Sequence, residues 1–214
     1  MNAYQVSTYD QVHANWLLFD LIEEGSISRI KPQYAHLYCP KCFKPHHEKA
    51  FEFGFAAGAK FRVRGQIQTT LDGFLCVHDV VRALMEKHKW SGLALKEVPG
   101  APWHVVNVTE RVWANAACFT SSGFKCEVCG RVREVTGSVM RMISIAIPST
   151  PGTFFTPTID RAGSTNGERD VFITEDIYQC LKTERIKGAC FSRLMDAKAV
   201  ERNQRKWQKL KQAV

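Results

Sequence analysis

Residues 74–98 read FLCVHDVVRALMEKHKWSGLALKEV, and the same order of residue types returns at residues 171–194 as VFITEDIYQCLKTERIKGACFSRL. Each segment begins with a short apolar run. Acidic residues and apolar positions at helical spacing follow, and a glycine precedes a second apolar run. This pattern is typical of a strand, a helix, a turn and a second strand. The sequence therefore predicts an internal repeat of this unit.

An apolar stripe marks the core-facing side of each predicted helix. The stripes consist of Val80, Val81, Leu84 and Met85 in the first copy and of Ile177, Cys180 and Leu181 in the second. Asp79, Glu175 and Asp176 place negative charge in the first helical turn, where the helix dipole favours it. Thr174 directly precedes the acidic pair and is predicted to cap the second helix.

Two Cys-x-x-Cys pairs stand out among the eight cysteines of the chain. They are Cys39-Pro-Lys-Cys42, which is followed by Phe43, and Cys126-Glu-Val-Cys129-Gly130. In a zinc knuckle the chain turns back so that both sulfur atoms point at one ion, and Gly130 allows the positive φ that such a turn often needs. The sequence thus predicts one structural Zn²⁺ ion that is held by four thiolates and has no open coordination position. A catalytic metal is not expected here.

The predicted zinc site would join parts of the chain that lie far apart in sequence. Residues 103–112 and 132–147 are rich in β-branched and aromatic side chains, so antiparallel strands should lead into and out of the second knuckle, and zinc would cap a β-hairpin. Glycine, proline and small polar residues at 148–169 predict a long loop. Phe154, Phe155 and Arg161 are candidate partner-binding residues in that loop, although the core is an equally good place for the two phenylalanines.

Other interpretations of the cysteine pairs stay open. Each pair could be a redox pair of the thioredoxin type, or the four cysteines could hold an iron-sulfur cluster. His46 or His47 could replace one cysteine ligand, because both follow the first knuckle closely. Two tight knuckles favour a single tetrahedral ion over these alternatives.

The commonest enzyme signatures, such as a P-loop or a Gly-x-Ser-x-Gly motif, do not occur in the sequence. Acid-base pairs could still form from His78, His88 or His104 with Asp79 or Glu110, and the lone cysteines Cys118 and Cys190 could act as nucleophiles. Ordinary capping, solvation and core packing account for such residues equally well. We therefore expect a protein that is not an enzyme and has no small-molecule substrate.

The composition is that of an ordinary globular protein. The 214 residues are 45% hydrophobic and 23% charged. We expect one zinc-stapled α+β domain at residues 1–194, with mixed or antiparallel sheets, followed by a basic C-terminal helix or tail at residues 195–214. No leader-like segment or long apolar stretch is present, which predicts a cytoplasmic protein that does not enter membranes.

The formal charge of +8 raises the question of nucleic acid. Much of the excess lies in the tail, which carries Lys198, Arg202, Arg205, Lys206, Lys209 and Lys211 against Asp196 and Glu201. A solvated helix explains that charge without a partner. A zinc-ribbon-like nucleic-acid-binding protein that uses Arg131, Arg133, Arg141 and the tail is the alternative function.

The two knuckles, CPKC near residue 40 and CEVCGR near residue 126, together with the ending ITEDIYQCLKTERIKGACFSRL, resemble the double-CxxCG proteins. That family is known mainly from myxobacteria, and some of its members are immunity proteins paired with polymorphic toxins. The resemblance implies a bacterial, cytoplasmic immunity protein that binds and neutralises a cognate toxin, with zinc at Cys39, Cys42, Cys126 and Cys129. The family pattern differs at Phe43, which stands where a glycine is expected, and in the basic tail.

Overall fold

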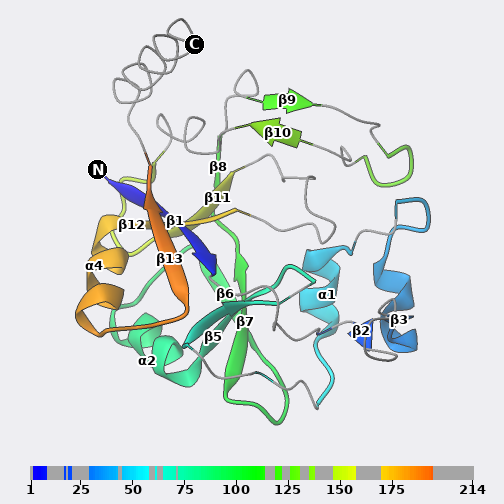
Figure 1. Ribbon diagram of the computed structural model, residues 1–214, viewed down its shortest axis with the longest axis horizontal. Coiled ribbons are helices and arrows are strands. Elements are labelled where there is room, and N and C mark those ends of the chain that lie inside the picture. The colour runs from blue at the N-terminus through cyan, green and yellow to red at the C-terminus, as the bar shows by residue number, and fades with distance from the viewer. Residues whose placement is uncertain are drawn as a thin grey trace, which may run out of the picture.

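The computed structural model describes residues 2–8, 17, 19–20, 29–42, 45–57, 61, 65–70, 72–113, 119–121, 126–130, 135–137, 147–157 and 170–194. These residues form a mixed α+β fold, as predicted, in which two principal β-sheets lie next to a small number of helices (Figure 1). One sheet is wholly antiparallel and the other contains one parallel pair.

The antiparallel sheet has four strands and is built around residues 74–98. In spatial order they are β4 (Ile67–Thr69), β5 (Leu75–His78), β7 (Trp103–Val108) and β6 (Leu93–Glu97). Helix α2 (Asp79–Lys87) links β5 to β6, and β7 then returns between them.

The second sheet has five strands and includes both ends of the described chain. Their spatial order is β13 (Ala189–Arg193), β1 (Ala3–Thr8), β12 (Val171–Thr174), β11 (Phe154–Pro157) and β8 (Arg111–Val112). Helix α4 (Glu175–Thr183) links β12 to β13. The N-terminal strand β1 lies between these two strands and is antiparallel to both, whereas β8 pairs with β11 in parallel.

Shorter elements surround the two sheets. They are β2 (Phe19–Asp20), β3 (Arg29–Ile30), the 3₁₀ helix η1 (Pro32–Leu37), α1 (His47–Phe53), β9 (Phe119–Ser121) and β10 (Val135–Gly137). Strands β9 and β10 form an antiparallel pair, and the second cysteine pair lies between them in sequence. The basic tail at residues 195–214 lies outside the described residues.

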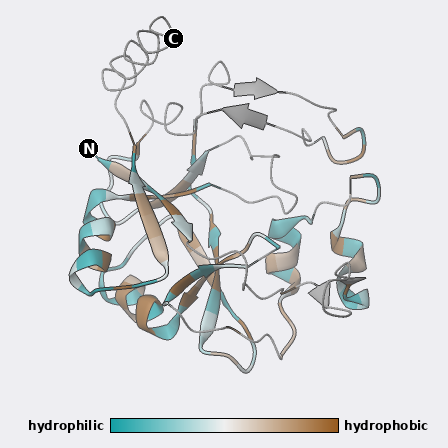
Figure 2. Cartoon of the chain, viewed as in Figure 1, coloured by the Kyte–Doolittle hydropathy of each residue, from teal (hydrophilic) through white to brown (hydrophobic). Residues whose placement is uncertain are grey.

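The main hydrophobic core lies where α2 and α4 meet the two sheets. Its buried residues include Val81, Leu84, Met85, Ile177 and Leu181 from the helices and Ile67, Val77, Val106, Phe154 and Ile173 from the strands. Strands β12 and β13 appear largely hydrophobic beside the hydrophilic exterior of α4 in Figure 2. Val80 was predicted to belong to the core, but it is exposed, because it lies about a quarter-turn from the centre of the buried face of α2.

A second core covers the opposite face of the four-stranded sheet. Cys76, Trp103 and Val105 contribute from β5 and β7. Tyr34, Leu37 and Ala50 contribute from η1 and α1, the elements on either side of the first cysteine pair. The packing of this cluster therefore fixes the first knuckle against the sheet.

The predicted loop at residues 148–169 contains β11, and this corrects two expectations. Phe154 is buried in the main core, and Phe155 stacks on Phe172 with the ring centroids 5.6 Å apart. Neither ring is available to a partner. The strand was missed because it is very short, follows Gly152 closely and ends with Pro157. Arg161 lies outside the described residues.

Helices α2 and α4 begin where the sequence predicted, but the hydrogen bond made by Thr174 differs from the predicted cap. Thr174 directly precedes α4, but its hydroxyl accepts a hydrogen bond from the backbone N–H of Thr153 at 3.1 Å and not from the helix. His78 directly precedes α2, and its Nδ1 accepts from the backbone N–H of Val80 at 3.4 Å. The threonine therefore ties α4 to the turn before β11.

No helix among the described residues is both long and apolar enough to cross a lipid bilayer.

Gly188 provides a test of the packing between the two sheets. Its φ is +99°, and a Cβ there would lie 2.2 Å from the carbonyl oxygen of Ile67. Gly100 also has a positive φ, +76°, but a Cβ there would meet nothing within 4 Å. Gly100→Ala should therefore lower the free energy of unfolding by about 1 kcal/mol. Gly188→Ala should lower it by about 3 kcal/mol or more in urea titrations. Equal losses would contradict the close approach.

Candidate metal centre

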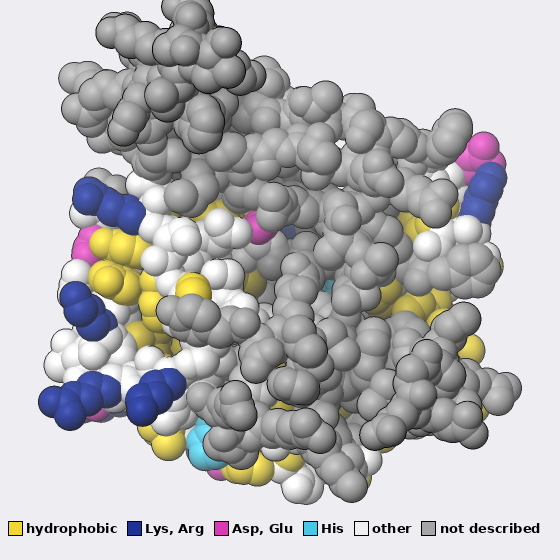
Figure 3. Space-filling model, in the orientation of Figure 1, with side chains coloured by type: hydrophobic (Ala, Val, Ile, Leu, Met, Phe, Trp, Pro, Cys, Tyr) yellow, Lys and Arg dark blue, Asp and Glu magenta, His cyan; other side chains and the backbone are white. Residues whose placement is uncertain are grey.

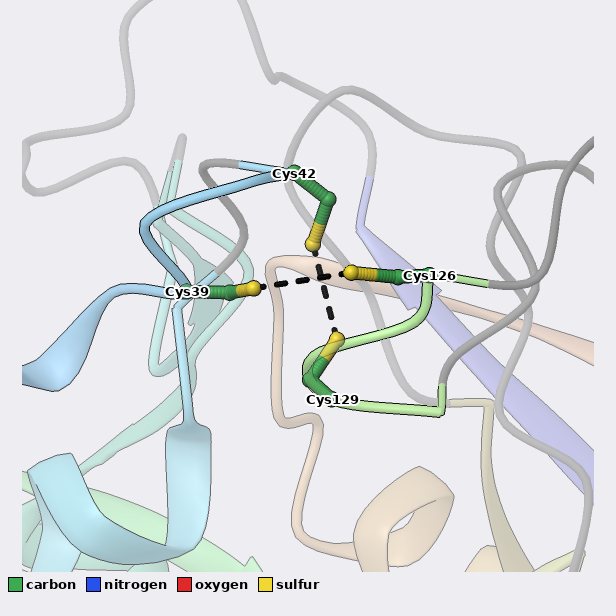
Figure 4. Close-up of side chains that lie close together, drawn as sticks. All are labelled: Cys39, Cys42, Cys126 and Cys129. Atoms are coloured by element: carbon green, nitrogen blue, oxygen red, sulfur yellow. Dashed lines mark hydrogen bonds between the residues drawn. The ribbon is translucent and has the colours of Figure 1, made fainter.

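The fold brings together the four cysteines that the sequence selected. One sulfur atom from each of Cys39, Cys42, Cys126 and Cys129 lies within 4.8 Å of all the others. The first pair follows η1, and the second lies in the turn at residues 126–130, so the four side chains converge from two separate loops (Figure 4). This arrangement could hold a metal ion.

The sulfur spacing fits tetrahedral coordination. The Sγ atoms of Cys39 and Cys126 are 3.6 Å apart, and those of Cys42 and Cys129 are also 3.6 Å apart. A tetrahedral Zn²⁺ ion with Zn–S bonds of about 2.3 Å requires sulfur atoms about 3.8 Å apart. A disulfide would require about 2.05 Å, and all four residues are free thiols. The spacing fits a shared ion and not a pair of cross-links.

Each knuckle has local features that suit metal binding. Gly130 has a φ of +70°, as predicted, and its N–H donates to the carbonyl of Cys126 at 2.7 Å, which closes the second turn. At the first knuckle, the backbone N–H of Cys42, with a further contribution from that of Lys41, lowers the pKa of the Cys39 thiol. The thiolate is the form that binds metal.

The site is shielded on one side. Cys39 and Cys126 are buried, whereas Cys42 and Cys129 are half-buried. Outside the cluster, Lys41 of the first knuckle forms an ion pair with Glu127 of the second. The two knuckles are therefore joined both at the sulfur atoms and at the surface, although 87 residues separate Cys39 from Cys126.

The histidines near the first knuckle take other positions. His46 precedes α1, and His47 is its first residue. The Nε2 atom of His47 lies 2.9 Å from the carbonyl oxygen of Asp72, and its ring packs edge-on against Phe74 at 4.7 Å. The close cluster of candidate ligands among the described residues consists of the four cysteines.

The structure joins one of the candidate acid-base pairs. His104 Nε2 donates to Asp79 Oδ1 at 2.7 Å, and Arg82 contacts the same oxygen at 3.4 Å. The hydrogen bond from His104 is the main reason why the pKa of Asp79 is lowered, and the attraction of Arg82 adds to it. His78 caps α2, and His88 stacks near Trp90.

The described lone cysteines are buried or half-buried. Cys76 is fully buried in the second core, and desolvation raises the pKa of its thiol well above the ordinary value. Burial also raises the pKa of Cys180 in α4. Cys190 is half-buried in β13, and Cys118 lies outside the described residues.

Comparisons with known proteins add no relative to this picture. No model of a known protein family matches the sequence, and a search of curated proteins finds no significant match.

Metal analysis of the purified protein tests the shared site. We expect one metal ion per chain, and we expect Cys39→Ser and Cys126→Ser each to abolish its binding, because each knuckle supplies half of the ligands. Either change should lower the free energy of unfolding by at least about 3 kcal/mol, because metal binding is coupled to folding. Cys190→Ser is the matched control and should keep the metal. Retention of the metal in either knuckle variant would refute a shared site.

The lowered pKa of Asp79 predicts a pH-dependent contribution to stability. The folded pKa lies below the unfolded value of about 3.9, so the stabilisation is complete above that pH and is lost as the pH falls through the folded pKa. Asp79→Asn should therefore lower the urea midpoint at pH 7 and have a smaller effect at about pH 3, below the unfolded pKa. Asp176→Asn removes an acid from the first turn of α4 and controls for the helix dipole. A loss that stays the same at both pH values would contradict the role of this pair.

Proposed function

We propose that the four cysteines bind one structural Zn²⁺ ion and that the protein is an immunity protein, which neutralises a cognate bacterial toxin by binding it. The convergence of the four sulfur atoms is the observation that supports the metal assignment. Thiolate ligands suit zinc, and a four-thiolate site has no coordination position for a substrate. The role of the ion would be to hold the scaffold, and the protein would not be an enzyme.

The immunity function rests on the resemblance of the two knuckles and of the C-terminal segment to the double-CxxCG proteins. Neutralisation by binding requires a preformed surface, because ordering flexible groups costs affinity. A site that ties two distant loops together suits that requirement. We place the protein in the cytoplasm of a bacterium, where a self-protecting antitoxin must meet its toxin.

The finer organisation belongs to the same proposal. Residues 1–194 would form one zinc-stapled domain, with repeat units at residues 74–98 and 171–194, and the second knuckle would cap a β-hairpin. The pairing of β9 with β10 supports the hairpin, because these strands precede and follow the knuckle. Residues 195–214 would form a basic appendage to this domain.

The toxin-binding surface must use residues other than Phe154 and Phe155, which are buried. Four large apolar side chains of the described region are exposed, and two of them are exposed most. Val128, in the second knuckle, is 60% exposed, and Trp113, just after β8, is 58% exposed. They are the first positions to substitute when the surface is mapped.

Nucleic-acid binding is the second candidate function, and one surface favours it. Lysine and arginine side chains gather over α4 and the turn that follows it (Figure 3). Lys182, Arg185 and Lys187 are exposed there, although Glu184 offsets part of their charge. Binding to phosphates would weaken steeply as salt increases, and affinity that does not depend on salt would exclude this function.

Co-expression tests the immunity function. The protein should restore growth to cells that express the toxin encoded next to it, and the two proteins should elute together from gel filtration. Cys39→Ser should abolish protection if the scaffold depends on zinc, whereas Cys190→Ser should protect fully. Failure of the native protein to protect, together with the absence of a complex, would exclude the proposal.

A further inference from the structure

The two principal sheets exchange strands. In the four-stranded sheet, β7 lies between β5 and β6, and these three strands are antiparallel neighbours. In the five-stranded sheet, β1 takes the corresponding position between β12 and β13. Strand β1 begins the first half of the chain but pairs within the second, whereas β7 begins the second half but pairs within the first.

The two sheets also match in register, residue for residue. One row across the four-stranded sheet consists of Gln68, Cys76, Val105 and Lys96. The corresponding row of the five-stranded sheet consists of Phe155, Phe172, Gln5 and Ser192. The helix follows the second strand of the row in both cases, at α2 and at α4. A slip of one residue in either sheet would have turned its side chains to the opposite face.

The hydrogen bonds at the strand ends repeat as well. The N–H of Val98 donates to the carbonyl of Trp103 at 2.9 Å, and the N–H of Leu194 donates to that of Ala3 at 2.8 Å. At the helix starts, the N–H of Asp79 donates to the carbonyl of Pro102, and the N–H of Glu175 donates to that of Asn2. Asn2 and Pro102 therefore hold equivalent places before β1 and β7.

Contacts between the two sheets are reciprocal. After α2, the carbonyl of Ser91 accepts from the N–H of Phe154 in β11; after α4, the carbonyl of Lys187 accepts from the N–H of Ile67 in β4. The glycines that follow behave alike. A Cβ on Gly92 would lie 2.1 Å from the carbonyl oxygen of Phe154, and a Cβ on Gly188 would lie 2.2 Å from that of Ile67. Contacts of this kind, in which each side provides what the other receives, define a two-fold interface.

The cysteine cluster obeys the same relation. The first knuckle lies between β1 and β4, and the second lies between β7 and β11, which are the equivalent strands. Cys39 contacts Cys126, and Cys42 contacts Cys129; both pairs are 87 residues apart in sequence and 3.6 Å apart at sulfur. Each sulfur atom therefore contacts its own counterpart, as happens where a two-fold axis crosses an interface.

We infer that the described parts of residues 3–97 and of residues 103–193 are two copies of one folding unit. The two copies exchange β1 and β7 and share a metal site on the two-fold axis between them. Each unit packs against the other through the same surface. The single chain therefore has the arrangement of a two-fold symmetric dimer. The connections differ: α1 follows the first knuckle, whereas β9 and β10 lie on either side of the second.

Cleavage of the chain between the two units tests the interface. The readout is zinc binding, so this experiment rests on the proposed metal assignment. A protease site is placed in the full-length protein at residues 99–102, where a side chain at Gly100 would meet nothing within 4 Å. Two variants of this protein are made, Cys39→Ser with Cys42→Ser and Cys126→Ser with Cys129→Ser. Each is cleaved, and the two are unfolded together and refolded with zinc. We expect neither variant alone to bind zinc and the mixture to gain it, because an intact first unit can then meet an intact second unit.

Cleaved wild-type protein is the control, and its two fragments should stay together in native buffer and recover zinc after refolding. Separation of these fragments without denaturant would overturn the interlocked arrangement. If the mixture stays metal-free while the refolded control recovers zinc, the inference that the two units assemble through a shared interface is wrong. If intact and cleaved wild-type protein both lack zinc but the fragments stay together, the metal assignment fails and the interlocked arrangement survives.

Circular permutation tests the equivalence of the units without relying on metal. The permuted chain runs from residue 103 to 194, then through residues 99–102, then from residue 3 to 98, and ends with residues 195–214. Residues 99–102 should close the gap from Leu194 to Ala3, because the hydrogen bond there matches that between Val98 and Trp103. We expect a monomer whose circular dichroism and urea midpoint are close to those of the native order. If the permuted chain is unfolded while the cleaved wild-type fragments stay together, the two units are not equivalent.

Discussion

Strand β1 joins the two ends of the described chain, because it inserts between β12 and β13. Residues near the start of the chain complete a sheet whose other strands lie near its end, with Tyr4 opposite both Ile173 and Arg193. Closing so long a loop costs conformational entropy, which only a cooperative structure can offset. The backbone ladder of β1 and the burial of Ala3 contribute to that compensation. The described strands of the second sheet are thereby held in one topology.

The cysteine cluster is a second long-range tie, made by a different kind of bond. Strand pairing uses many weak backbone hydrogen bonds, whereas the knuckles bring together at one point four thiols that could bind a metal ion. The first knuckle is held by the core around Tyr34, Leu37 and Ala50, so a metal ion bound to the four cysteines would be coupled to the four-stranded sheet.

Equivalent positions of the two sheets carry different side chains. The acid that begins α2, Asp79, meets His104, whereas the acid that begins α4, Glu175, meets the hydroxyl of Tyr4. Both acids have lowered pKa values, for which the main causes are the hydrogen bonds from His104 and from Gln179, respectively. The two sheets therefore share a backbone arrangement at the helix starts, but the side-chain hydrogen bonds there differ. This is expected if the shared requirement is packing and the surfaces serve separate purposes.

Local patterns were enough to predict helices α2 and α4 and the four clustered cysteines. The spacing of Leu84 and Met85, or of Ile177 and Leu181, defines a buried face, and a Cys-x-x-Cys turn is complete within a few residues. Packing in three dimensions selected which strands are neighbours, buried Phe154 and Phe155, and brought His104 to Asp79. These outcomes join residues far apart in the chain. Their partners are selected by packing and register over the whole fold, which no local pattern records.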